Sequence, residues 1–162
     1  MLGRNDEALK AYDKAISIDP NDADTCLRKG LALFDLIRPD EAIEAYDKAL
    51  GLKPDLALAW LSKGSALMAV SRYQEAIGAF DRAIQHNTDH LEAAWVNKGA
   101  ALRLLKRYRE SLDAFAEALK VNRRSAQAWY NLGGVLHIIG RVEDAERAFD
   151  NARRLGLDVD AV

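Results

Sequence analysis

The chain has 162 residues, of which 49% are hydrophobic and 30% are charged, and its formal net charge is −2. This near-neutral balance gives no global attraction to nucleic acid or to an anionic membrane, and the single cysteine cannot form an internal disulfide or a zinc site. No apolar run reaches the roughly 18 residues of a membrane-spanning helix, and the start, MLGRNDEALKAY, lacks the pattern of a signal peptide. Helix-favouring residues abound and only three prolines occur, so we expect an all-α cytoplasmic protein.

Helical periodicity and turn signals predict one leading helix and then four helical pairs. The leading helix covers 5–18, and IDPNDAD (18–24) ends it, because proline and acidic or amide residues stop one helix and cap the next. The predicted pairs are 23–36 with 39–52, 57–70 with 73–86, 92–105 with 108–121, and 126–139 with 142–155. Pro39 would stand in the first turn of its helix, where a missing N–H is tolerated.

The same columns of residues return about every 34 residues, which indicates an internal repeat. The glycine column is Gly30, Gly64, Gly99 and Gly133. Four residues before each glycine stand Cys26, Trp60, Trp95 and Trp129. The aromatic column is Tyr12, Tyr46, Phe80, Phe115 and Phe149. The small-residue columns are Ala8, Ala42, Ala76, Ser111, Ala145 and Ala15, Ala49, Ala83, Ala118, Ala152. Glycine inside a helix costs about 1 kcal/mol relative to alanine, so its return predicts a close approach by the neighbouring helix.

This set of spaced columns resembles the tetratricopeptide repeat, a 34-residue helix–turn–helix unit. The resemblance covers a single array over 1–162, with a leading half-repeat (2–22) and repeats 23–56, 57–91, 92–125 and 126–159. It implies a right-handed superhelix in which the first helix of each pair lines a concave groove. Cys26 departs from the pattern, because an aromatic residue is usual there. We see no polar capping helix in the columns, so we expect a piece of a longer array; the alternative is a short protein whose open ends associate.

The groove implied by the resemblance would be lined by a stripe of residues beside the tryptophan column. The candidate groove residues are Leu27, Arg28, Leu31, Leu58, Leu61, Ser62, Ser65, Met68, Val96, Asn97, Arg103, Tyr130, Asn131 and His137. This mixture of apolar and hydrogen-bonding side chains suits an extended peptide or an amphipathic helix of a partner protein. The alternative is that Leu27, Leu58 and Leu61 only pack between neighbouring helices.

Two binding modes of the family can be compared with this stripe. The clamp that binds C-terminal carboxylates would place lysine and asparagine where Leu27 and Leu31 stand, so the resemblance does not extend to that mode. The asparagine ladder that holds peptide backbone is matched by Asn97 and Asn131 in the last two repeats only. The stripe therefore contains half of such a ladder.

Catalytic, metal and cofactor sites are not predicted. His86 and His90 straddle a helix end and a turn with no third ligand nearby, and Cys26, in a buried column, is expected to be an inert thiol. Every repeated glycine lies inside a helix, so none forms a phosphate loop. We predict a non-enzymatic scaffold that binds a protein or peptide partner, with no nucleic acid, no membrane and no cofactor. The alternatives are a structural array that self-associates through its exposed repeat ends, or the regulatory arm of a larger enzyme.

Overall fold

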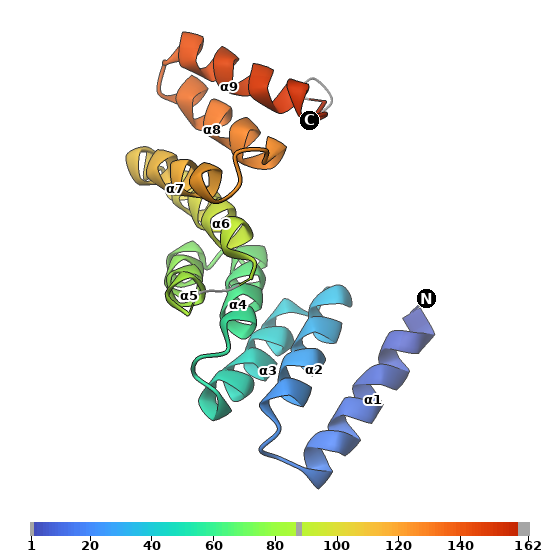
Figure 1. Cartoon of the computed structure of the whole chain (residues 1–162). Coiled ribbons are helices and arrows are strands. Elements are labelled where there is room, and N and C mark those ends of the chain that lie inside the picture. The colour runs from blue at the N-terminus through green and yellow to red at the C-terminus, as the bar shows by residue number, and fades with distance from the viewer. Residues whose placement is uncertain (1, 87–88, 159–162) are drawn as a thin grey trace. The chain divides into compact units, whose positions relative to one another are not determined.

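The computed structural model describes residues 2–86 and 89–158, and within these ranges the chain forms nine α-helices and no strand. The helices are α1 (Leu2–Ile18), α2 (Ala23–Asp35), α3 (Pro39–Leu52), α4 (Ala57–Ala69), α5 (Tyr73–Gln85), α6 (Leu91–Leu104), α7 (Tyr108–Val121), α8 (Ala126–Ile138) and α9 (Val142–Arg154) (Figure 1). The predicted leading helix and four pairs are confirmed. Observed helix ends differ from the predicted ones by one residue at most, except that α1 begins at Leu2 instead of residue 5. The turn residues Asn87 and Thr88 and the tail after Asp158 lie outside the described residues.

The helices belong to two compact units, divided after Thr88. In the first unit α2 packs on α3 and α4 on α5, while α1 contacts α2 and α3 contacts α4. In the second unit α6 packs on α7, α8 on α9, and α7 on α8. The first helices of successive pairs also touch, α2 with α4 and α6 with α8. Within each unit, each helix therefore packs on its neighbours along the chain, as in an array of helical repeats.

The two helices of each pair are joined by a turn that contains one residue in the left-handed backbone region. These residues are Ile37 (φ 59°), Ser71 (φ 61°), Lys106 (φ 60°) and Gly140 (φ 81°). After α2, the Ile37 N–H donates to the Phe34 carbonyl at 2.9 Å and the Arg38 N–H donates to the Leu33 carbonyl at 3.0 Å. These two bonds form a Schellman motif, which satisfies carbonyls at the end of the helix.

The N-cap residue before each second helix is an arginine, paired to a carboxylate three residues later. The pairs are Arg38–Glu41, Arg72–Glu75, Arg107–Glu110 and Arg141–Asp144. In the second of these, Arg72 Nε and Nη2 donate to the two Glu75 oxygens at 2.7 and 2.6 Å. The hydrogen bonds lower the pKa of Glu75, and its negative charge is favourable in the first turn of α5.

An aromatic ring lies on a glycine at the centre of each pair. A Cβ built on Gly64 would lie 2.4 Å from Cε1 of Phe80, and one on Gly99 would lie 2.6 Å from Cε1 of Phe115. Both rings are fully buried, so neither has room to move away. The predicted close approach at the glycine column is confirmed. Ser111, which replaces alanine in its column, donates from its buried hydroxyl to the Gly99 carbonyl at 2.7 Å.

The outer side of α9 is polar where α7 is apolar. Leu119 of α7 is buried in a cluster that includes Trp129 of α8, whereas the equivalent residue of α9 is Arg153. Likewise Glu146 stands where α7 has Leu112, and Arg153 Nη1 lies 4.0 Å from Glu146 Oε2. This side of α9 is therefore not suited to the apolar packing through which α7 meets the next repeat. The single array over 1–162 and its place in a longer one stay predictions.

Candidate functional site

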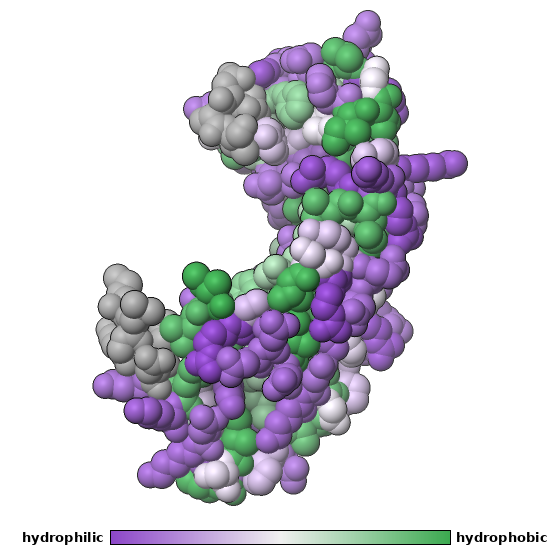
Figure 2. Space-filling view, turned by 180° about the vertical axis from the view of Figure 1, so that it is seen from behind, coloured by the Kyte–Doolittle hydropathy of each residue, from purple (hydrophilic) through white to green (hydrophobic). Residues whose placement is uncertain are grey.

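The predicted groove residues all lie on first helices, on α2 and α4 in the first unit and on α6 and α8 in the second. Because α2 contacts α4 and α6 contacts α8, each unit brings two segments of the stripe together. We describe the two surfaces separately. Figure 2 shows apolar side chains reaching the surface as separate patches among polar ones on the side that it presents.

The leucines of the first unit divide into buried and accessible residues. Leu27 and Leu61 are only 6% and 8% exposed, which favours the interpretation that they pack between helices. Leu31 and Leu58 are 36% and 37% exposed, and Arg28 beside them is exposed too. The apolar area that this unit offers to a partner therefore comes from Leu31 and Leu58.

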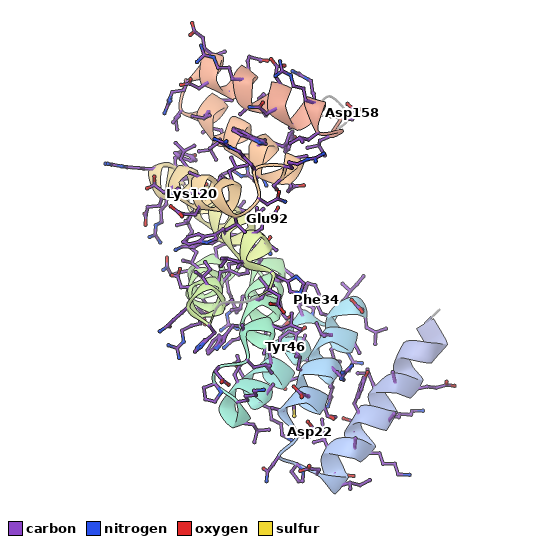
Figure 3. All side chains as sticks on the ribbon, viewed as in Figure 1. Asp22, Phe34, Tyr46, Glu92, Lys120 and Asp158 are labelled. Atoms are coloured by element: carbon purple, nitrogen blue, oxygen red, sulfur yellow. The ribbon has the colours of Figure 1, made fainter. Side chains whose placement is uncertain are left out.

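The other predicted residues of α4 are Ser62, Ser65 and Met68, all half-buried. The Ser65 hydroxyl donates to the Leu61 carbonyl of its own helix at 3.2 Å. The Ser62 hydroxyl lies close enough to the Tyr46 phenol to influence it, and the Tyr46 side chain is labelled in Figure 3. Burial raises the pKa of the Tyr46 phenol, and the Ser62 hydroxyl acts against that shift. Although the Ser62 hydroxyl is near, the buried Tyr46 Oη has no partner within hydrogen-bond geometry among the described residues.

Two asparagines hold equivalent positions on the first helices of the second unit. Asn97 lies on α6 and Asn131 on α8, the two helices are in contact, and both side chains are half-buried. Within the part of the chain that the structure describes, we find no hydrogen bond from either side-chain amide. Each amide carries one acceptor oxygen and two donor hydrogens. Both sets of polar atoms are therefore available to a ligand.

The other predicted groove residues of α6 and α8 are of mixed chemistry. Val96 is buried at 8% exposure. Tyr130 is half-buried, and its ring lies 5.8 Å from the ring of Phe149 in a tilted arrangement. Arg103 is half-buried and His137 is exposed towards the ends of α6 and α8. The surface thus combines amides, one aromatic ring and two groups that can carry positive charge.

Surface hollows lie away from this stripe. One is lined by residues of α1, α2 and α3, among them Cys26, and another by residues around the junction of α7 and α8, among them Trp129. None of the predicted groove residues lines either hollow. The predicted groove stripe gave no indication of the first hollow. The sequence signal for it was Cys26, the one position of the tryptophan column that is not a tryptophan.

The groups considered for chemistry stand where the sequence placed them. His86 follows α5 as its C-cap and His90 precedes α6 as its N-cap, and the searched part of the chain holds no group of three metal-ligating side chains. Cys26 is 1% exposed, and burial raises the pKa of its thiol. Among the described helices, none has the length and apolar character needed to cross a bilayer.

Comparison with known proteins identifies the repeat. The family model described as Tetratricopeptide repeat matches residues 27–90, 61–119 and 100–156, and a model described as TPR repeat matches residues 2–36. No curated protein matches the chain.

Solved structures are similar over nearly the whole chain. A crystal structure of MamA shares 27% identity with a TM-score of 0.90, and the match covers 94% of this chain and 89% of that one. Pseudomonas aeruginosa pilF shares 24% identity with a TM-score of 0.84, covering 96% and 71%. YrrB, described as a TPR protein with an unusual peptide-binding site, shares 23% identity with a TM-score of 0.79, covering 91% and 76%. The last two likenesses concern the fold alone.

The repeat models match most of the chain, and the same ring-on-glycine contact recurs in all four helical pairs. The chain therefore belongs to the tetratricopeptide repeat family.

Proposed function

We propose that this protein is a scaffold that binds a peptide segment of a partner protein on the surface of its first helices. The observation that carries the proposal is the pair of asparagine amides on α6 and α8, Asn97 and Asn131, which make no hydrogen bond within the described residues. Half-buried amides on two touching helices suit the paired donors and acceptors of a peptide backbone. The half-buried ring of Tyr130 beside them offers apolar contact area.

The comparisons support this proposal at the level of the family. YrrB is described as having a peptide-binding site, and its likeness to this chain makes the same class of ligand a reasonable expectation. The accessible leucines of the first unit, Leu31 and Leu58, would add side-chain contacts to the same ligand class. The buried Leu27 and Leu61 would contribute through the shape of the surface.

A peptide-display experiment tests the proposal. Random peptides are selected on the full chain, and enriched peptides are titrated by fluorescence anisotropy against the wild type and against the double variant Asn97→Ala/Asn131→Ala. Two lost hydrogen bonds at about 1 kcal/mol each should weaken binding by about tenfold or more. Asn151→Ala on α9, another half-buried asparagine, is the matched control and should bind as the wild type does. Equal affinity of the double variant and the wild type would contradict the proposal, as would a failure to enrich any peptide.

A second candidate is association through α1, and a specific observation favours it. Tyr12 is half-buried, whereas its equivalents Tyr46, Phe80 and Phe115 are fully buried on the glycine of a preceding helix; Phe149, on Gly133 in the last pair, is half-buried as well. The accessible ring area of Tyr12 would favour contact with a helix of another chain. Light scattering over a concentration series should then show oligomers that Tyr12→Glu abolishes, and a wild type that stays monomeric throughout would exclude this candidate.

A further inference from the structure

The residues that surround Trp60 have equivalents around Cys26, one repeat earlier. Two cations lie over the Trp60 ring, with Lys63 Nζ and Arg82 Cζ each 5.5 Å from its centre. Its Nε1–H donates to the Pro54 carbonyl at 2.8 Å. The equivalent residue one repeat earlier is Cys26, whose side chain is far smaller than an indole.

The frame that holds the Trp60 ring persists around Cys26. Lys29 and Lys48 stand 34 residues before Lys63 and Arg82, and both line a hollow of about 230 Å³ beside Cys26. Lys29 and its equivalent Lys63 each form an ion pair with an aspartate. Lys29 Nζ lies 2.6 Å from Asp13, and Lys63 Nζ lies 2.5 Å from Asp47.

The lining of this hollow is half apolar and half charged, and it comes from three helices. Ile16 of α1, Leu33 of α2 and Ala45 of α3 line it, together with two carboxylates, Glu41 and Glu44. Burial raises the pKa of the Cys26 thiol, which therefore stays neutral. The hollow thus combines apolar side chains with two lysines and two glutamates, and no tryptophan fills it.

We propose that this hollow is a binding site for an indole-sized aromatic ring that comes from outside the chain. Its volume of about 230 Å³ exceeds the roughly 150 Å³ of an apolar cavity known to accept benzene. The ring would be buried against Ile16 and Leu33, with the Lys29 and Lys48 ammonium groups placed for cation–π contact. The Pro20 carbonyl, equivalent to that of Pro54, would accept its N–H.

This site is separate from the proposed peptide surface. Its lining residues belong to α1, α2 and α3, whereas the asparagines lie on α6 and α8. No residue of the predicted groove lines the hollow. Either proposal can therefore fail without the other.

Fluorine NMR with 5-fluoroindole as the probe tests the site on the full chain. The wild type should shift and broaden the probe signal in a saturable manner with one site per chain. Cys26→Trp places the chain's own indole in the hollow and should weaken probe binding at least tenfold. Cys26→Ala leaves the hollow open and should bind as the wild type does, which also excludes reaction with the thiol. Equal binding by Cys26→Trp and the wild type would overturn the proposal, as would a probe signal that never saturates.

The reverse substitution is the matched control. Trp60→Cys should open a second hollow in the same frame and raise the number of probe sites from one to two, with the helix content checked by circular dichroism. Titration with N-acetyl-5-fluorotryptophanamide separates the two sources of the ring. Binding of both probes shows that a tryptophan side chain of a partner can enter, whereas binding of 5-fluoroindole alone assigns the site to a free aromatic molecule.

Discussion

Replacing Gly64 by alanine tests the ring-on-glycine contact directly. Elsewhere in a helix, glycine to alanine stabilises by about 1 kcal/mol. At Gly64 the new methyl carbon would stand 2.4, 2.7 and 2.9 Å from three atoms of the Phe80 ring, and that ring is fully buried. Forcing a methyl group into such packing costs about 1–3 kcal/mol. We therefore expect Gly64→Ala to lower the free energy of unfolding by up to about 2 kcal/mol, once the gain in helix propensity is subtracted.

Gly78 of α5 is the matched control, because a Cβ built there meets nothing within 4 Å. Urea unfolding followed by circular dichroism should show Gly78→Ala stabilised by about 1 kcal/mol, so that the two variants differ by about 1–3 kcal/mol. A double-mutant cycle with Phe80→Leu should recover part of the loss, with an interaction energy of about 1 kcal/mol or more. If Gly64→Ala stabilises as much as Gly78→Ala does, the steric argument for the glycine column is wrong.

Three further predictions concern other features of the repeats. Ile37→Gly should raise the urea midpoint, because it relieves the backbone strain of a β-branched residue at φ 59°, a net gain of about 0.5–1 kcal/mol. Gly140→Ala should lower the midpoint for the converse reason. An unchanged midpoint for Ile37→Gly would argue against strain at this position. Tyr46→Phe should stabilise by about 1 kcal/mol, because its buried hydroxyl has no hydrogen-bond partner within the described residues; a loss of stability would reveal a bond to that oxygen. Arg72 lowers the pKa of Glu75 from its ordinary 4.5, so the stability contributed by this ion pair is fully present above pH 4.5 and is lost as the pH falls through the lower pKa of the folded state. On acidification, the urea midpoint of Arg72→Gln should therefore fall less than that of the wild type. Parallel pH profiles of the two proteins would contradict this.

The periodic columns were enough to predict the helices and their pairing. Gly64 and Phe80 recur with fixed spacing, and a fixed spacing between a glycine and an aromatic ring leaves few ways to bring the two helices together. The exposure of the stripe was not predictable in the same way. Leu27 and Leu31 both belong to it, yet Leu27 is buried and Leu31 is 36% exposed. The difference in exposure depends on how a neighbouring helix covers each residue. The periodicity of residues within a single helix carries no information about that coverage.

The hollow beside Cys26 could not be predicted from the sequence, because residues of three helices line it. The sequence marks Cys26 as an exception in its column, but an exception can be filled by larger neighbours. Only the placement of Ile16, Lys29 and Lys48 around it shows that the space stays open. The polar side of α9 is a related case. Leu112 and Leu119 of α7 pack against the next repeat, and only this packing shows that the equivalent Glu146 and Arg153 make α9 unsuited to the same contact.

The ring-on-glycine contact also has a consequence for how the chain can misfold. It fixes the register within a pair, since a shift by one residue would place the ring on a side chain instead of a glycine. All four pairs, however, place an aromatic ring on a glycine at equivalent positions, a tyrosine in the first pair and a phenylalanine in the other three, so the first helix of one repeat is sterically acceptable to the second helix of another. Chain order and the short connecting turns then select the native partner, together with pair-specific contacts such as the hydrogen bond from Ser111 to the Gly99 carbonyl. Helix exchange between chains, with native-like contacts in the wrong pairs, is therefore the expected product of refolding at high concentration.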